Sequence, residues 1–196
     1  MATVRSGTQP VLVVVDVQVG VLRAGWEAAR VIANVARCVD QARAQRVPVI
    51  WVQHHSDELP RGGADWQWVP ELVPAETELR IDKRFPSSFE QTPLEAELAR
   101  LGATHITLAG AQTNWCIRAT AYAALERGYD LTLVEDAHTT DDVELGENRR
   151  LAAEGMVQDL NIAMSWLRYP GRSTTTAAAA ALTFVGESNR ETRAQP

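Results

Sequence analysis

A short apolar run near the N-terminus, VLVVV over residues 11–15, constrains the fold more than any other feature, and it ends at Asp16. The run does not alternate with polar residues, so it lacks the pattern of a strand with one solvated face. A continuous β-branched run of this length is typical of a strand buried on both faces, as in parallel sheets. The sequence therefore predicts a parallel sheet with helices on both sides.

Strand and helix patterns alternate along the rest of the chain. Further strand candidates lie at residues 48–53, 105–110, 131–134 and 173–177, and helical patterns at residues 26–46, 93–101, 115–127 and 147–166. This alternation predicts an α/β fold, a three-layer Rossmann-like sandwich whose sheet is mostly parallel. We expect one domain over residues 1–196, in which residues 186–196 form a frayed tail.

Bulk composition excludes several classes of partner. The 196 residues carry a net charge of −6 and no basic stripe, so we expect no nucleic-acid partner. No apolar run is long enough to span a bilayer, and the N-terminus lacks the apolar core of a signal peptide. The two cysteines do not make a disulfide framework. We therefore expect a cytoplasmic protein with reduced thiols.

Cys116 is the strongest candidate for chemistry. It lies between a predicted strand and a predicted helix, where unpaired backbone N–H groups and the helix dipole favour an anion. That position predicts a lowered thiol pKa and a nucleophile. The alternative is a small buried hydrophobe at the start of a core helix. Ligands of such sheets bind beyond the carboxyl ends of the strands, and this topology brings Asp16 and Cys116 to the same edge.

Three motifs occur in order along the chain. They are Asp16-x-Gln18 after the first strand, Lys83 in the run IDKRFP, and a Gly-x-x-Thr-x-x-Cys sequence that ends at Cys116. Together they resemble the isochorismatase-like cysteine hydrolases, which include nicotinamidases, carbamoylsarcosine amidases, ureidoacrylate amidases and isochorismatases. The resemblance extends from about residue 11 to residue 177. It implies a six-stranded sheet and a catalytic triad of Asp16, Lys83 and Cys116.

The triad residues suit the hydrolysis of an amide. The Cys116 thiolate attacks the carbonyl, Asp16 accepts the thiol proton, and Lys83 stabilises the charges. The resemblance also implies a cis peptide bond before Gln112, so that the backbone N–H groups of Gln112 and Cys116 form an oxyanion hole. Taken singly, Asp16 is more typical of an acid that caps a loop at the end of a strand, and Lys83 is more typical of a surface lysine. Only their joint occurrence with Cys116 favours catalysis.

The second predicted strand ends without a complete metal site. By the resemblance, nicotinamidases carry Asp-x-His at this point and two further histidines in the following loop. Here the run is Gln53-His54-His55, and no histidine follows until His105. Since a metal site needs about three protein ligands, we predict no metal and no cofactor. We expect His55 to face the pocket and His54 to point outward. His138 follows the fourth strand, and we do not expect it to be catalytic.

Residues 54–85 form a long segment rich in proline, glycine and tryptophan. A loop of that length inside a compact domain is usually functional, so we expect it to determine the substrate. Some aromatic residues should line an apolar pocket, and the others should pack in the core or at a subunit interface. The pocket candidates are Gln18, Leu22, His55, Trp66, Trp68, Phe85 and Trp115.

The leading interpretation is a metal-independent cysteine hydrolase that cleaves a small amide or related C–N bond through a thioester. One alternative is isochorismatase-type vinyl-ether hydrolysis, although relatives with that activity commonly lack the cysteine. Another is a non-catalytic thiol sensor on the same scaffold. The long helices and surplus tryptophans offer apolar surface, so we expect a homo-dimer or homo-tetramer. The only other expected partner is a small-molecule substrate.

Overall fold

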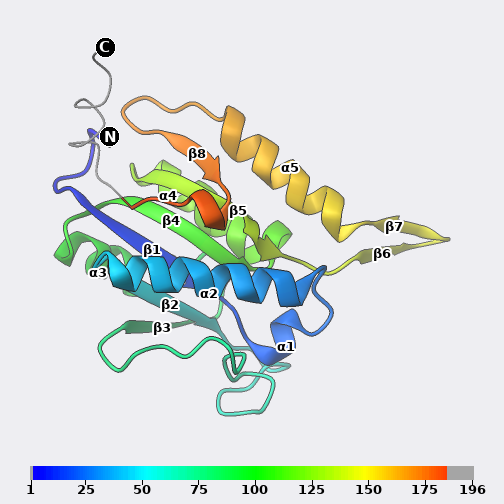
Figure 1. Cartoon of the computed structure of the whole chain (residues 1–196). Helices are drawn as coiled ribbons and strands as arrows, with labels where there is room; N and C mark the ends of the chain where they lie inside the picture. The colour runs from blue at the N-terminus through cyan, green and yellow to red at the C-terminus, as the bar shows by residue number, and fades with distance from the viewer. Residues whose placement is uncertain (1, 185–196) are drawn as a thin grey trace.

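The central layer of the computed structural model, which describes residues 2–184, is a six-stranded sheet (Figure 1). Its strands are β1 (Gln9–Val15), β2 (Val49–His54), β3 (Leu79–Lys83), β4 (Ala103–Ala111), β5 (Asp130–Thr139) and β8 (Thr174–Ala177). Their order is β3-β2-β1-β4-β5-β8, and every neighbouring pair is parallel. The predicted α/β sandwich is therefore confirmed. The tail expected at residues 186–196 lies outside the described residues.

Helices cover both faces of the sheet. On one face, α2 (Ala28–Ala44) and the short η2 turn (Ala179–Ala181) pack on Leu12 and Val14 of β1. On the other face, α3 (Leu94–Arg100), α4 (Arg118–Glu126) and α5 (Ala153–Trp166) pack on Val11, Val13 and Val15. Alternate residues of β1 thus enter two separate cores, which explains why residues 11–15 are all apolar and fully buried. Within residues 2–184, no helix combines the length and hydropathy needed to cross a membrane.

Two segments differ from the prediction. Strand β3 lies inside the segment expected to be one long loop. Along this edge strand the exposed Arg80 and Asp82 alternate with less exposed residues, as in a strand that has one face on the core. The helix expected over residues 147–166 begins only at Ala153, where Oδ1 of Asp142 accepts a hydrogen bond from the Ala153 backbone at 2.8 Å. Glu147 and Asn148 both have positive φ and form a turn instead.

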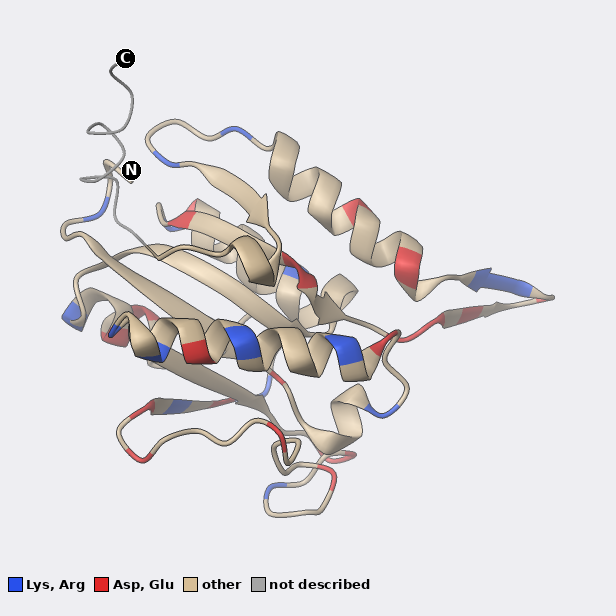
Figure 2. Ribbon diagram, viewed as in Figure 1, with Lys and Arg blue, Asp and Glu red and all other residues tan. Residues whose placement is uncertain are grey.

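That turn joins β6 (Val143–Gly146) to β7 (Arg149–Leu151) in an antiparallel hairpin. The hairpin extends away from the body of the protein beyond the start of α5 (Figure 1). Its two strands carry opposite charges, acidic on β6 and basic on β7 (Figure 2), and Glu144 pairs in register with Arg150. This projection was not predicted from the sequence, which indicated a helix beginning at residue 147.

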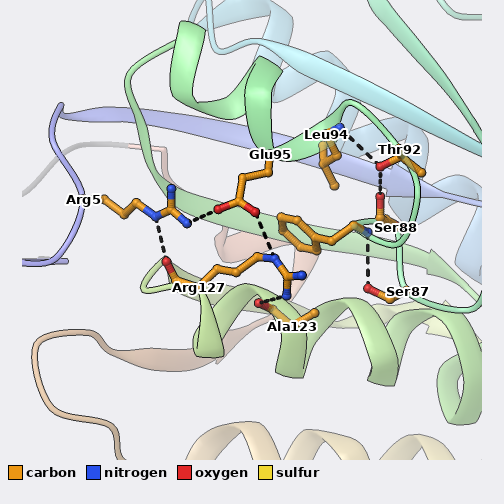
Figure 3. A network of polar contacts seen from close by, with 9 residues as sticks. Arg5, Ser87, Ser88, Thr92, Leu94, Glu95, Ala123 and Arg127 are labelled. Atoms are coloured by element: carbon orange, nitrogen blue, oxygen red, sulfur yellow. Dashed lines mark hydrogen bonds and ion pairs between the residues drawn. The ribbon is translucent and has the colours of Figure 1, made fainter.

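Polar contacts fix the segment that follows β3. Glu95 on α3 accepts hydrogen bonds from both Arg5 and Arg127, so it links the N-terminal segment to the end of α4 (Figure 3). Thr92 donates to the backbone oxygen of Ser88 and closes the turn before α3. The backbone N–H of Ser88 donates to Oγ1 of Thr120 on α4 at 3.0 Å, so the chain between Lys83 and α3 is held close to α4.

Candidate functional site

The ends of two strands and one helical turn bring Asp16, Lys83 and Cys116 together. Asp16 follows β1, Lys83 ends β3, and Cys116 lies in η1, a π-helical turn over Thr113–Ile117 between β4 and α4. Lys83 Nζ is 2.6 Å from Asp16 Oδ2 and 3.1 Å from Cys116 Sγ. The structure thus places the three predicted catalytic residues in one cluster at the carboxyl edge of the sheet.

Local backbone geometry allows the ends of β1 and β4, and so Asp16 and Cys116, to come close together. Gly110 has a φ of +125°, and a Cβ at this position would lie 1.9 Å from the backbone oxygen of Val15. Only glycine allows the ends of β1 and β4 to come this close. Asp16 itself has a φ of +53°, in the left-handed region that aspartate tolerates better than most residues. The peptide bond between Ala111 and Gln112 is cis, as the resemblance implies.

The electrostatics of the cluster correct one prediction. Burial, with a further contribution from the Asp16 carboxylate, raises the pKa of the Cys116 thiol to about 12. The expected lowering of this pKa by the helix terminus is therefore wrong. Burial alone would lower the pKa of Lys83, but the Asp16 carboxylate, together with the hydrogen bonds to Asp16 and Cys116, outweighs burial and raises that pKa. The resting site therefore contains an ammonium group and a protonated thiol.

Buried hydrogen bonds support the turn that carries Cys116. His138 Nδ1 lies 2.8 Å from Thr113 Oγ1, and His138 Nε2 lies 2.9 Å from Asn161 Oδ1. Thr140 donates a hydrogen bond to Asn114 Oδ1. His138 is thus a buried supporting residue, which the sequence analysis did not recognise. The sequence placed His138 after the strand predicted at residues 131–134, but β5 continues to Thr139 and contains His138.

A pocket of about 260 Å³ opens beside the cluster. Its lining contains both polar and apolar side chains. They are Asp16, Val21, His54, Pro86, Gln112, Trp115 and Cys116.

Of the seven residues expected to line the pocket, Trp115 does so and the other six do not line this cavity. Gln18 and Leu22 are buried, and Trp68 packs edge-on against Trp51 with their ring centres 5.4 Å apart. Trp66 contributes its backbone oxygen to hydrogen bonds with buried side chains. Phe85 is 40% exposed and does not reach the lining.

The two adjacent histidines have the reverse of their expected positions. His54 lines the pocket, whereas His55 lies outside it with Nε2 2.9 Å from Nη2 of Arg61. The reason is that His54 is the last residue of β2 and His55 already belongs to the exposed loop. Pro86, three residues after Lys83, was also missed.

The residues near the end of β2 do not fit a nicotinamidase-type metal site. Gln53 stands where such a site has an acid, and its amide donates to the Trp66 backbone oxygen at 2.6 Å. Within residues 2–184, no group of three or more His, Cys, Asp or Glu side chains could hold a metal ion. Independence from metals remains a prediction about activity.

Comparison with known proteins identifies the family of this chain. Residues 10–166 match the family model of the isochorismatase domain. A streptothricin hydrolase of Streptomyces noursei is 32% identical over 79% of this chain and 61% of its own length. The chain therefore spans about three fifths of that relative. A ureidoacrylate amidohydrolase of an Enterobacter species is 29% identical over 55% of this chain and 60% of its own length.

Solved structures resemble the chain over nearly its whole length. A crystal structure of an isochorismatase from Pseudomonas putida has a TM-score of 0.77 and 27% identity, over 91% of this chain and 93% of its own. A cysteine hydrolase from Pseudomonas syringae has a TM-score of 0.78 over 88% and 90% of the two chains. At 20% identity, that second likeness shows the fold alone.

Proposed function

The chain belongs to the isochorismatase family, and on this premise we propose that it is a cysteine hydrolase that cleaves the C–N bond of a small amide. The observation that carries the proposal is the position of Lys83 Nζ, 2.6 Å from Asp16 Oδ2 and 3.1 Å from Cys116 Sγ. The relatives named as a streptothricin hydrolase and a ureidoacrylate amidohydrolase support it.

The first half of the reaction forms the thioester. Because the Cys116 thiol is protonated at rest, sulfur attack requires a base, and the Asp16 carboxylate is the buried acid beside it. Oδ1 of Asp16 is buried without a hydrogen-bond partner within residues 2–184, so it is open to receive the proton. The backbone N–H groups of Gln112 and Cys116 bind the oxyanion, and such a donor is typically worth about 3–4 kcal/mol. The C–N bond then breaks, and the amine leaves with the proton from Asp16.

The second half restores the enzyme. A water molecule attacks the thioester carbonyl while Asp16 again accepts a proton. The C–S bond breaks, the acid product leaves, and the sulfur regains its proton from Asp16. Lys83 stays charged throughout, because its raised pKa keeps the ammonium protonated at neutral pH. Its role is to hold the carboxylate and the sulfur in place and to offset their negative charge.

The test is ammonia release from a panel of small uncharged and anionic amides, together with intact mass measurement of the protein during turnover. We expect at least one amide to be hydrolysed and its acyl group to appear on Cys116. Cys116→Ala and Asp16→Asn should each abolish turnover. Cys38→Ala is the matched control, because Cys38 is a free thiol that is fully buried in α2. Equal activity of the parent and either triad variant would contradict the mechanism.

The same variants separate the alternatives. Vinyl-ether hydrolysis of isochorismate that persists in Cys116→Ala would favour the isochorismatase-type reaction, which does not need the sulfur. A thiol sensor would be alkylated at Cys116 without hydrolysing any amide. Since the nucleophile must stay reduced, we further propose that the protein is cytoplasmic. We also propose that it is a homo-oligomer and that its substrate is a small molecule.

A further inference from the structure

His54 is held beside the triad by a side chain that the Asp-x-Gln motif supplies. The Gln18 amide is fully buried and makes two hydrogen bonds to the His54 backbone, with Oε1 accepting from its N–H and Nε2 donating to its oxygen, each at 2.9 Å. Nε2 of Gln18 also donates to the backbone oxygen of Trp66 at 2.9 Å. On its other side, His54 is aligned with Lys83 in the parallel pairing of β2 and β3. The position of His54 in the pocket is therefore fixed from two sides.

The imidazole of His54 has hydrogen-bonding capacity that the described residues do not use. Nδ1 is buried and has no partner within residues 2–184, and His54 is one of the residues that line the pocket. Burial, together with the charge of Lys83, lowers the pKa of His54, so the ring is neutral at pH 7. A neutral imidazole offers one N–H donor and one nitrogen acceptor. Buried polar atoms without a partner are rare and call for an explanation.

The remaining lining determines what charge the pocket accepts. Val21, Pro86 and Trp115 are apolar or uncharged, and Asp16 brings a negative charge. The charged groups that act on His54 are Lys83, Asp16, His55 and Glu58. Lys83 is already engaged with Asp16 and Cys116. A carboxylate on the substrate would thus meet the Asp16 charge without a free cation among the lining residues.

We propose that His54 is a substrate-binding residue that hydrogen-bonds the polar group of an uncharged carboxamide or ureido substrate in this pocket. The proposal deepens the proposed function and rests on it for the reaction, but the binding part can be tested without turnover. An anionic substrate is disfavoured, because its carboxylate would lie close to Asp16.

The test uses iodoacetamide, an uncharged carboxamide, and iodoacetate, which has the same shape and a negative charge. Both form an S–C bond to Cys116 with release of iodide, while the thiol proton passes to Asp16. The Cys38→Ala background leaves one reactive thiol, and intact mass measurement over a range of reagent concentrations gives KI and the limiting rate. For each thiol we take the rate with iodoacetamide divided by the rate with iodoacetate. We expect this ratio to be about ten times larger for Cys116 than for free cysteine.

His54→Phe keeps a flat ring and removes both nitrogens, so we expect KI for iodoacetamide to rise about fivefold, as for one lost hydrogen bond. The limiting rate should change less, because the triad is intact. His54→Asn retains a donor and an acceptor and should recover part of the affinity. His55→Phe is the matched control, because that neighbour lies outside the pocket and should leave KI unchanged.

Two results would overturn the inference. An unchanged KI in His54→Phe would show that the imidazole does not contact the bound group. A parent that distinguishes the reagents no better than free cysteine would refute the preference for an uncharged substrate. If the alkylation pattern is as expected while no amide is hydrolysed, the hydrolase proposal fails and the binding inference stands. Thermal unfolding of each variant identifies any that fail to fold, and His54→Asn then carries the test.

Discussion

His138 gives a pH-dependent contribution to stability whose size follows from the structure. The ring is fully buried between Thr113 and Asn161, and burial lowers its pKa from 6.5 to about 4. Nδ2 of Asn161 donates to the Glu135 backbone oxygen, so its Oδ1 is the acceptor that faces His138 Nε2. The neutral ring therefore carries its proton on Nε2 and accepts a hydrogen bond from Thr113 at Nδ1.

The sign of the effect follows from proton uptake. Above pH 6.5 the histidine is neutral in both the folded and the unfolded chain, so the full stability is present. As the pH falls from 6.5 toward 4, the unfolded chain binds a proton that the folded protein does not, and the free energy of unfolding decreases. The shift of about 2.5 pKa units corresponds to about 3 kcal/mol.

Urea unfolding followed by tryptophan fluorescence at several pH values between 7 and 4 measures this loss. Carboxylates also titrate in that range, so the comparison is with His138→Gln, which keeps a donor and an acceptor but cannot be protonated. We expect the free energy of unfolding of the parent to fall about 3 kcal/mol more than that of the variant. Parallel curves for the two proteins would refute the reasoning, because the buried histidine would then contribute nothing to the pH dependence.

Three further predictions concern metals, assembly and the pocket. Treatment with a strong chelator should leave hydrolysis unchanged, whereas a loss restored by zinc or manganese would show that the end of β2 has been misinterpreted. Light scattering at micromolar concentration should give the mass of a dimer or tetramer, and a mass near 21.5 kDa would contradict the expected assembly. Trp166 is 79% exposed on α5, so Trp166→Ser should weaken the assembly if that helix forms the interface. Trp115→Ala should raise KM or change the ranking of amides, whereas Trp68→Ala should mainly lower the unfolding temperature, because Trp68 packs on Trp51. A changed ranking in the Trp68 variant alone would reverse that assignment.

The sequence predicted the parts of the fold that depend on burial. The apolar run of β1 indicated a strand with helices on both sides, and the structure has separate cores on its two faces. Strand β3 was missed because an edge strand buries only alternate residues, and its pattern resembles that of a loop. The β6–β7 hairpin was missed because nearly all its residues are exposed, so hydrophobic periodicity carries no signal there.

The candidate site was predictable where sequence order determines position. Asp16 and Cys116 follow strands that end at one edge, so topology alone brought them together. The residues that line the pocket were harder to predict, because a loop sequence does not indicate which side of the sheet the loop covers. Trp68 is half-buried and packs against Trp51 of the core, outside the pocket lining. A shift of one residue along the chain exchanged the expected places of His54 and His55.

The thiol pKa shows which electrostatic effect dominates the site, and it leads to a last prediction. A helix terminus contributes about 0.3–1 kcal/mol, whereas a rise of the Cys116 pKa from 9.0 to about 12 corresponds to about 4 kcal/mol, so burial and the Asp16 charge prevail. Asp16 therefore has two opposed effects, since it adds to burial in raising the pKa of the resting thiol and yet accepts the thiol proton during attack. Asp16→Asn should lower the thiol pKa, because Lys83 then acts on the sulfur alone, and should abolish turnover, because the base is gone. Ultraviolet thiolate absorbance measured against pH, with Cys116→Ala subtracted to remove the contribution of Cys38, gives the pKa. A variant that loses activity with an unchanged or raised thiol pKa would show that Asp16 does not govern the ionisation of the nucleophile.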